Sequence, residues 1–229
     1  YARIQYPHLR MDGYDLYAAW TTQDLGSGTP NYRSVHFMKS GDGGHSWQTA
    51  GGASLVLPVA ADDTGPTNMV SLADEVSVNT WLSSFLVDGS GIHFMYYAAA
   101  PVDRQHYVRF SKATGSCDIN LFPAWTAGES SIASLDGLFV ARPDGILFAV
   151  AHDRSARLAV FLSDDGGTTW LDYALSEPLE AGYAHYSIGG CREITPSGRI
   201  MGTYTKQDMA GGLHDVCFFS IDAGQWSPP

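Results

Sequence analysis

Hydrophobic and polar residues alternate along this chain in short runs, and turns that contain glycine separate the runs. Four runs of strand-forming residues each follow an Asp-Gly or Ser-Gly pair, at 16–20, 92–97, 146–150 and 200–204. Runs of this length and composition, bounded by turn residues, predict β-strands. Each run then continues through a loop into a further strand that ends at a short turn. The pattern therefore predicts four repeats of one antiparallel strand module.

Each repeat is expected to form a sheet of four antiparallel strands. The expected strands are 2–9, 14–21, 33–39 and 46–49 in the first repeat, 80–87, 91–98, 105–112 and 117–121 in the second, 135–141, 145–152, 156–163 and 169–174 in the third, and 186–194, 199–205, 213–220 and 225 onward in the fourth. The 25 Gly, 11 Pro and 12% aromatic residues are typical of an all-β protein that is rich in turns. We expect a single domain over residues 1–229.

An eight-residue frame occurs twice in full, as Ser40-Gly41-Asp42-Gly43-Gly44-His45-Ser46-Trp47 and again from Ser163 to Trp170. Its aspartate can accept hydrogen bonds from N–H groups of its own turn, and its glycines allow a positive φ, so the frame predicts a β-hairpin. We expect Asp42 and Asp165 to be structural and not catalytic acids. The positions with an expected structural role are Ser40, Asp42, Gly44, Trp47, Ser163, Asp165, Gly167 and Trp170.

At these residues the sequence resembles the Asp-box proteins, also called bacterial neuraminidase repeat proteins, whose members include the sialidases. Altered copies of the frame stand near Ala113 and Ser220. The resemblance implies a β-propeller with four recognisable blades, and a secreted or periplasmic location. Two interpretations are open: a closed ring of four blades, or part of a larger ring. A partial ring would expose an apolar flank, so an oligomer is expected in that case.

The net charge of −11 and the lack of any Lys/Arg cluster argue against nucleic acid or an anionic membrane as a partner. The basic residues are ten Arg and three Lys. Arginine binds carboxylates and sulfates through two parallel hydrogen bonds, so an acidic sugar is one explanation of this usage. A plain bias in composition is the other.

The chain has three cysteines, Cys117, Cys191 and Cys217, with no CxxC pair and no Cys/His metal spacing. The number of cysteines is odd, and Cys191 and Cys217 fall in the first and third expected strands of the fourth repeat, too far apart to bond. We therefore expect buried free thiols and no disulfide framework. We expect no metal and no cofactor.

The propeller resemblance implies that a ligand binds on the face opposite the eight-residue turns, where the loops between second and third strands meet the connections between blades. On that face the expected catalytic residues are Tyr186, His185, His152 and Asp153. The expected substrate-binding residues are Arg154, Arg192, Arg3, His106 and Trp81. Imidazole and carboxylate supply acid/base chemistry near neutral pH, and aromatic rings stack on sugars beside guanidinium groups that pair with carboxylates. A solvated hairpin tip at 152–157 and a buried Tyr186 are the alternatives.

Two further segments refine the resemblance. Arg3-Ile4, followed by Pro7, resembles the Arg-Ile-Pro segment that opens many sialidases and supplies an arginine for the substrate carboxylate, although Gln5-Tyr6 stands in between. The run 39–58 resembles a subgroup that includes neuraminidase-like proteins and ulvan-type polysaccharide lyases. The resemblance implies a carbohydrate-active protein that cleaves an acidic glycan by hydrolysis or elimination. The alternative is a non-catalytic propeller that binds a glycan or a protein.

Overall fold

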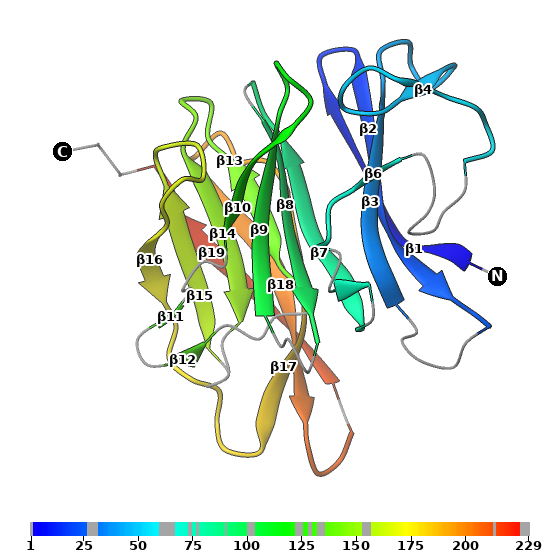
Figure 1. The fold of residues 1–229 in the computed structure, drawn as a ribbon. Helices are drawn as coiled ribbons and strands as arrows, with labels where there is room; N and C mark the ends of the chain where they lie inside the picture. Colours follow the sequence, from blue (N-terminus) through cyan, green and yellow to red (C-terminus); the bar gives the residue numbers. More distant parts are fainter. Residues whose placement is uncertain are drawn as a thin grey trace. The chain divides into compact units, whose positions relative to one another are not determined.

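The structure, a computed structural model, consists of β-strands joined by turns and loops (Figure 1). It describes residues 2–26, 32–59, 67–72, 75–76, 78–89, 91–99, 104–121, 126–127, 130–131, 136–152, 157–212 and 214–224. These residues contain no α-helix, and among them there is no helix that could cross a membrane. The fold class is all-β, as predicted, and four of its sheets are the blades of a β-propeller.

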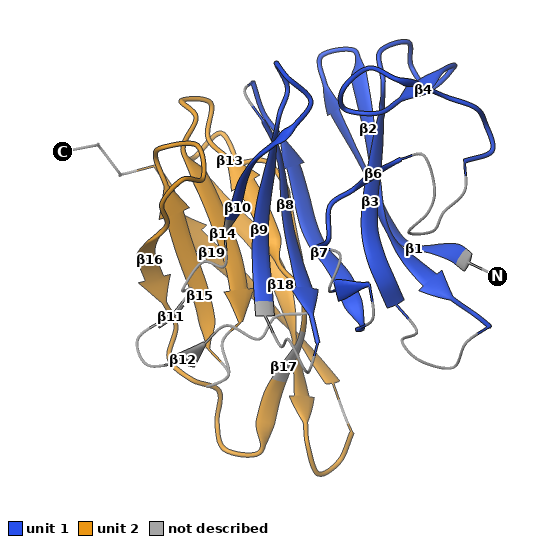
Figure 2. Ribbon diagram, in the orientation of Figure 1, with its two compact units in different colours: residues 1–122 blue, residues 123–229 orange. Residues whose placement is uncertain are grey.

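The chain divides into two compact units, residues 1–122 and residues 123–229 (Figure 2). Unit 1 holds two antiparallel sheets. The first sheet runs in the order β1 (Ala2–Asp12), β2 (Asp15–Asp24), β3 (Tyr32–Ser40), β4 (Trp47–Gln48) and β5 (Ser54–Leu55), and β6 (Asn68–Met69) pairs with β3. The second sheet consists of β7 (Thr80–Val87), β8 (Gly91–Ala98), β9 (Arg104–Ser111) and β10 (Cys117–Leu121).

Unit 2 holds two larger sheets and one short hairpin. The hairpin is β11 (Thr126–Ala127) with β12 (Ser130–Ser131). The third blade consists of β13 (Leu138–Ala141), β14 (Leu147–His152), β15 (Leu158–Ser163) and β16 (Leu171–Leu175). The fourth consists of β17 (Tyr183–Gly190), β18 (Arg199–Asp208) and β19 (His214–Asp222), and its expected last strand from 225 onward lies outside the described residues.

The predicted strand map is confirmed for every strand that the structure describes, with ends that differ by a few residues. The main addition lies in the insertion 51–78, which contributes β5 and β6 to the first sheet. Both strands are only two residues long, too short for an alternating pattern of hydrophobic and polar residues to indicate them.

The core of unit 1 is a cluster of aromatic rings between its two sheets. Phe37 of β3 lies 4.9 Å from Phe94 of β8 and 4.8 Å from Phe110 of β9, measured between ring centroids. Phe85 of β7 stacks on Phe94 at 5.5 Å. Buried aromatic pairs contribute both apolar burial and a directional ring contact. A hydrogen bond of 2.9 Å from the Leu82 N–H to the Thr21 hydroxyl also joins the two sheets.

The core of unit 2 is mainly aliphatic, with the rings of Phe148 and Phe219, and lies between its third and fourth blades. Leu138, Val140 and Val150 pack in one buried cluster with Ile188 and Ile200. The fourth blade is also tied to the third by polar contacts. The Tyr173 hydroxyl donates to the Asp222 carbonyl at 2.7 Å, and the Arg142 guanidinium donates to the Ala223 carbonyl at 2.9 Å.

The turn at 40–47 is closed by hydrogen bonds of its own serine and aspartate. The Ser40 hydroxyl donates to Asp42 Oδ1 at 2.8 Å and accepts the Gly44 N–H at 2.8 Å. Ser46 donates its N–H to Asp42 Oδ1 at 2.9 Å and its hydroxyl to Oδ2 at 2.6 Å. These bonds, those from Ser46 first, hold the pKa of Asp42 well below its usual range.

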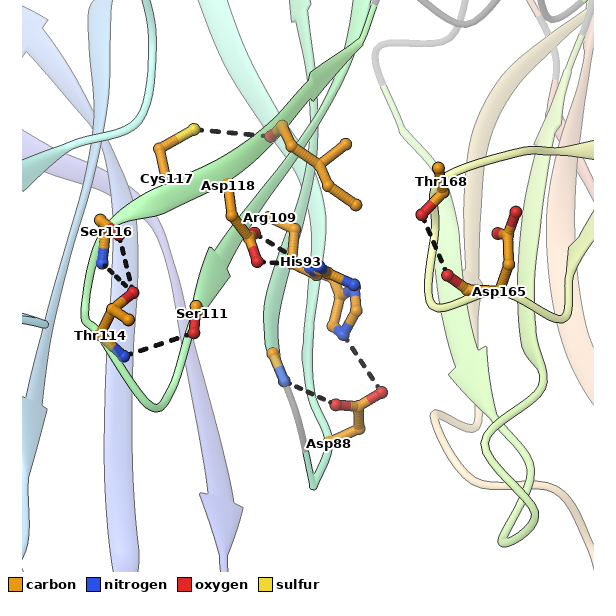
Figure 3. Close-up of polar contacts among 12 residues, drawn as sticks. Asp88, His93, Arg109, Ser111, Thr114, Ser116, Cys117, Asp118, Asp165 and Thr168 are labelled. Atoms are coloured by element: carbon orange, nitrogen blue, oxygen red, sulfur yellow. Dashed lines mark hydrogen bonds and ion pairs between the residues drawn. The ribbon is translucent and has the colours of Figure 1, made fainter.

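The turn at 163–170 repeats this arrangement. Thr169 donates its N–H to Asp165 Oδ1 at 2.9 Å and its hydroxyl to Oδ2 at 2.7 Å, and the Gly167 N–H donates to Ser163 Oγ at 2.8 Å. Figure 3 includes the further bond from the Thr168 hydroxyl to the Asp165 carbonyl. Burial alone would raise the pKa of Asp165, but the bonds from Thr169 outweigh it and the pKa is lowered.

The cysteines correct one expectation. All three are free, but Cys117 and Cys191 are exposed and Cys217 is half-buried. Cys117 begins β10, which is the edge strand of its sheet, and Cys191 follows the end of β17. The prediction of buried thiols was wrong because it did not take these positions at sheet edges and strand ends into account.

Candidate functional site

Each sheet of unit 1 has two unlike ends. Asp12 is the last residue of β1, and Asp88 follows the end of β7. Lys112 contacts the Asp12 carboxylate and donates to the Asp88 carbonyl, so these strand ends lie at the same end of unit 1 as the 40–47 turn. The opposite end is where β1, β3, β7 and β9 begin and β2 and β8 end. It is called the far end here. The face on which a ligand is expected corresponds to this end.

An arginine is held in place at the far end of the first sheet. Arg3 of β1 pairs with Gln23 of β2, which pairs with Tyr32 of β3, so the three side chains lie on one face in neighbouring strands. Arg3 Nε donates to Gln23 Oε1 at 2.7 Å, and Gln5 Nε2 donates to the same oxygen at 2.9 Å. Arg3 is exposed, and its two terminal nitrogens make no hydrogen bond or ion pair with any residue that the structure describes. They can therefore bind an anionic group.

Four aromatic rings follow one another along the same end, and they are called the aromatic row. Tyr6 lies 5.8 Å from Tyr32, Tyr32 lies 5.4 Å from Trp81 of β7, and Trp81 lies 5.9 Å from Tyr97 of β8, between ring centroids. Tyr6 is 49% exposed, and the other three rings are half-buried. Asn79 fixes the middle of the row, because its Oδ1 accepts the Tyr32 N–H at 3.0 Å.

Tyr6 has an unusual backbone. Its φ is 50°, and no other non-glycine residue in the described part of the chain has a positive φ. The pairing of β1 with β2 is irregular between Gln5 and His8, where a β-bulge interrupts the register. Bulges redirect side chains and are frequent beside functional sites. Here the bulge lies at the residue whose ring begins the aromatic row.

A buried polar cluster lies beneath the far end. Glu75 Oε1 is 2.5 Å from His106 Nε2, and Glu75 Oε2 accepts the Tyr96 hydroxyl at 2.7 Å and the Leu72 N–H at 2.8 Å. The rings of Tyr96 and His106 stack at 4.6 Å. Glu75, Tyr96 and His106 are all fully buried. His106, expected to bind substrate, therefore has its imidazole enclosed within unit 1.

In unit 2 the predicted site residues lie at two ends of the sheets. His152 is the last residue of β14, half-buried, at the end opposite the 163–170 turn, and Asp153 and Arg154 lie outside the described residues. His185 and Tyr186 lie near the start of β17, at the corresponding end of the fourth blade, and only their backbone is described. A register shift follows His185 in the pairing of β17 with β18.

Arg192 is not brought together with these residues. It follows the end of β17, beside Glu193, which forms a bridge with Ala141 at the other end of the third blade. It is half-buried, and burial lowers the pKa of its guanidinium.

The structure thus brings Arg3 and Trp81 to one end of unit 1, among residues that the sequence prediction missed. Those residues are Gln5, Tyr6, Gln23, Tyr32 and Tyr97. Gln23, Tyr32 and Tyr97 lie at or near the ends of predicted strands, which was the only available signal. Gln5 and Tyr6 lie inside the predicted strand 2–9 and had no such signal.

A second charged cluster, also not predicted, lies at the other end of the second sheet (Figure 3). His93 contacts Asp88 at 3.2 Å and the Tyr107 hydroxyl at 2.7 Å. Arg109 binds Asp118 through two bonds of 3.0 and 2.8 Å, which lower the pKa of Asp118. His93 and Tyr107 are buried, so this cluster braces β8, β9 and β10. The described residues contain no group of three His, Cys, Asp or Glu side chains that could hold a metal ion.

Comparison with known proteins shows the fold of the chain. No family model matches the sequence, and no curated protein matches it. Among solved structures, an ulvan lyase described as a new family of polysaccharide lyase is similar with a TM-score of 0.63 and 15% identity. The similarity covers 97% of this chain and 51% of the lyase, so the chain spans about half the length of that protein. The same lyase has been solved bound to -[GlcA(1-4)Rha3S]-.

Two other similar structures are complexes with different sugars. An α-L-arabinanase from Penicillium chrysogenum, complexed with arabinobiose, has a TM-score of 0.58 and 10% identity over 98% of this chain and 59% of its own. A sialidase from Trypanosoma rangeli, in complex with sialic acid, has a TM-score of 0.51 and 12% identity over 96% of this chain and 37% of its own. At these identities the likeness establishes the fold, and the chain shares the β-propeller fold of lyase, arabinanase and sialidase structures.

Proposed function

We propose that this protein is carbohydrate-active and that it acts on an acidic glycan at the far end of unit 1. The observation that carries this proposal is the pairing of Arg3 with the aromatic row. A guanidinium held by Gln23, with its terminal nitrogens directed to no described partner, is suited to a carboxylate or sulfate. The neighbouring rings are suited to the apolar faces of sugar rings. The similar lyase bound to a glucuronate-containing oligosaccharide supports this ligand class.

We further infer that the 40–47 and 163–170 turns are Asp-boxes with a structural role. Their hydrogen bonds satisfy groups within the turn itself, and both lie away from the far end of their sheets. This role agrees with the expectation that Asp42 and Asp165 stabilise hairpins and do not act as catalytic acids.

The proposed cleavage is by glycoside hydrolase or polysaccharide lyase chemistry. Tyr186, His185 and His152 are the acid/base candidates, with Asp153 and Arg154 beside them in the sequence. In elimination, a base removes the proton next to the sugar carboxylate while a cation stabilises the negative charge that develops there. The neighbouring glycosidic C–O bond then breaks, which leaves a C=C double bond in the uronate and a leaving oxygen that takes up a proton. In hydrolysis, a tyrosine or carboxylate attacks the sugar while an acid protonates the leaving oxygen, and water then releases the sugar from the enzyme.

Glycan binding without cleavage is the second candidate function. The observation that favours it is that the titratable groups beneath the aromatic row, Glu75, Tyr96 and His106, are fully buried. An enzyme needs an acid and a base that reach one bound atom. A binding protein needs only the arginine and the rings.

The proposal is tested with acidic oligosaccharides that contain uronate or sialate, using calorimetry for binding and the release of reducing ends or unsaturated uronate for cleavage. Arg3→Gln should weaken binding about tenfold or more, because a charge-assisted contact is lost. Lys39→Gln, the control, also removes one positive charge, but at the other end of β3, so it should leave binding unchanged. Equal affinity of the wild type and Arg3→Gln, or no binding of any acidic sugar, would refute the proposal. Binding without product would leave the binding function and exclude cleavage.

A further inference from the structure

We infer that the far end of unit 1 holds several consecutive sugar residues of one glycan chain, and not a single terminal sugar. This inference rests on the proposed function, and it names the part of the ligand that the aromatic row would contact. Its basis is the number, spacing and support of the four rings.

The aromatic row is longer than one sugar. Tyr6, Tyr32, Trp81 and Tyr97 form three successive ring contacts of 5.8, 5.4 and 5.9 Å. A sugar ring is comparable in width to one aromatic ring, so a single sugar covers one or two members of the row. A terminal sugar would leave the remaining rings without a ligand contact. An oligosaccharide laid along the row would use all four.

The row is supported by strands of both sheets. Its rings come from β1, β3, β7 and β8, so they are anchored on rigid elements. Asn79 holds the backbone of Tyr32, and the hydroxyls of Tyr6 and Tyr32 lie 3.4 Å apart. Rings that are already ordered lose little conformational freedom when a ligand binds. The row is therefore organised before any sugar arrives.

The backbone of Tyr6 also favours an extended site. A positive φ is unfavourable for tyrosine, and such outliers persist where the surrounding structure imposes them, often at ligand sites. The bulge between Gln5 and His8 brings the Tyr6 ring against Tyr32 and extends the row by one member. A site for one sugar at Arg3 would not need this extension.

The position of Arg3 sets the direction of the chain. Arg3 on β1 and Tyr32 on β3 lie on either side of Gln23 on β2, so their Cα atoms are roughly 10 Å apart. Arg3 therefore lies beside the part of the row that Tyr6 and Tyr32 form. An acidic sugar at Arg3 would place the following sugars toward Trp81 and Tyr97. The site would thus bind an acidic residue at one end and neighbouring residues by stacking.

The test is a series of oligogalacturonates of one to six residues, measured by calorimetry. The wild-type affinity should rise about tenfold or more between the monosaccharide and the tetrasaccharide and then level off, as further rings of the row are covered. Trp81→Ala should lose most of the increase in affinity with length, because it removes a ring from the middle of the row. Tyr97→Ala, at the end of the row, should lose part of the increase. Tyr14→Ala, an exposed tyrosine in the turn between β1 and β2, is the matched control and should change nothing.

The outcomes separate this inference from the proposed function. A monosaccharide that binds through Arg3 with the same affinity as the tetrasaccharide would overturn the inference alone. Absence of binding across the whole series and with sialate-containing oligosaccharides would overturn both. The wild-type length series decides the matter even if Trp81→Ala does not fold, and circular dichroism of each variant identifies that case.

Discussion

Replacing Glu75 by alanine should strongly destabilise unit 1. The Glu75 carboxylate binds the imidazole of His106, the hydroxyl of Tyr96 and the N–H of Leu72, and the three side chains are fully buried. Each buried polar group that loses its partner costs about 1–3 kcal/mol, and Glu75→Ala removes the partner of the His106 imidazole, the Tyr96 hydroxyl and the Leu72 N–H. Since a domain unfolds with about 5–15 kcal/mol, Glu75→Ala should lose a large part of the total free energy of unfolding.

Urea denaturation followed by tryptophan fluorescence measures this loss. Tyr96→Phe removes only one hydroxyl and should cost about 1–2 kcal/mol. The double variant should cost less than the sum of the two, by about 1 kcal/mol, because Glu75→Ala has already removed the acceptor of the Tyr96 hydroxyl. Glu177→Ala, at an exposed position, should stay within about 0.5 kcal/mol of the wild type. A loss below about 1 kcal/mol for Glu75→Ala, or additive losses in the double variant, would refute this reasoning.

The remaining predictions concern the turns and acid pH. Asp165→Ala should lower the free energy of unfolding by about 1–2 kcal/mol in urea, since Thr169 loses two bonds, and an unchanged value would contradict a structural role for this turn. The lowered pKa of Asp118, caused by its bonds from Arg109, contributes stability that is complete above a pH of about 4 and is lost as the pH falls below it. In Asp118→Asn the free energy of unfolding should therefore fall less steeply at acid pH than in the wild type. The same pH dependence in both proteins would argue against this contribution.

The strands and the eight-residue turns could be predicted because their causes are local. The hydrogen bonds of Asp42 and Asp165 go to residues within four positions, so the spacing in the sequence carries the geometry. Strand periodicity is local in the same way.

The site could be predicted only in part, because its contacts join distant residues. Arg3 and Trp81 were expected to bind substrate, but the support of Arg3 by Gln23 depends on the register of β1 against β2. The β-bulge at Tyr6 shifts the register of β1 against β2, and no glycine in the sequence indicates a bulge at this position. The enclosure of His106 depends on Glu75, which lies in an insertion with no periodic pattern. Long-range pairing decided each of these outcomes.

Hydrogen exchange of the whole chain, with and without a saturating uronate tetrasaccharide, tests the central claim most directly. Backbone amides near a bound ligand exchange more slowly. The account predicts slower exchange at 3–6, 32–33, 79–81 and 97–98, with no change at 40–47 or 111–117. Slower exchange confined to the 40–47 end of unit 1, with the far end unaffected, would contradict it.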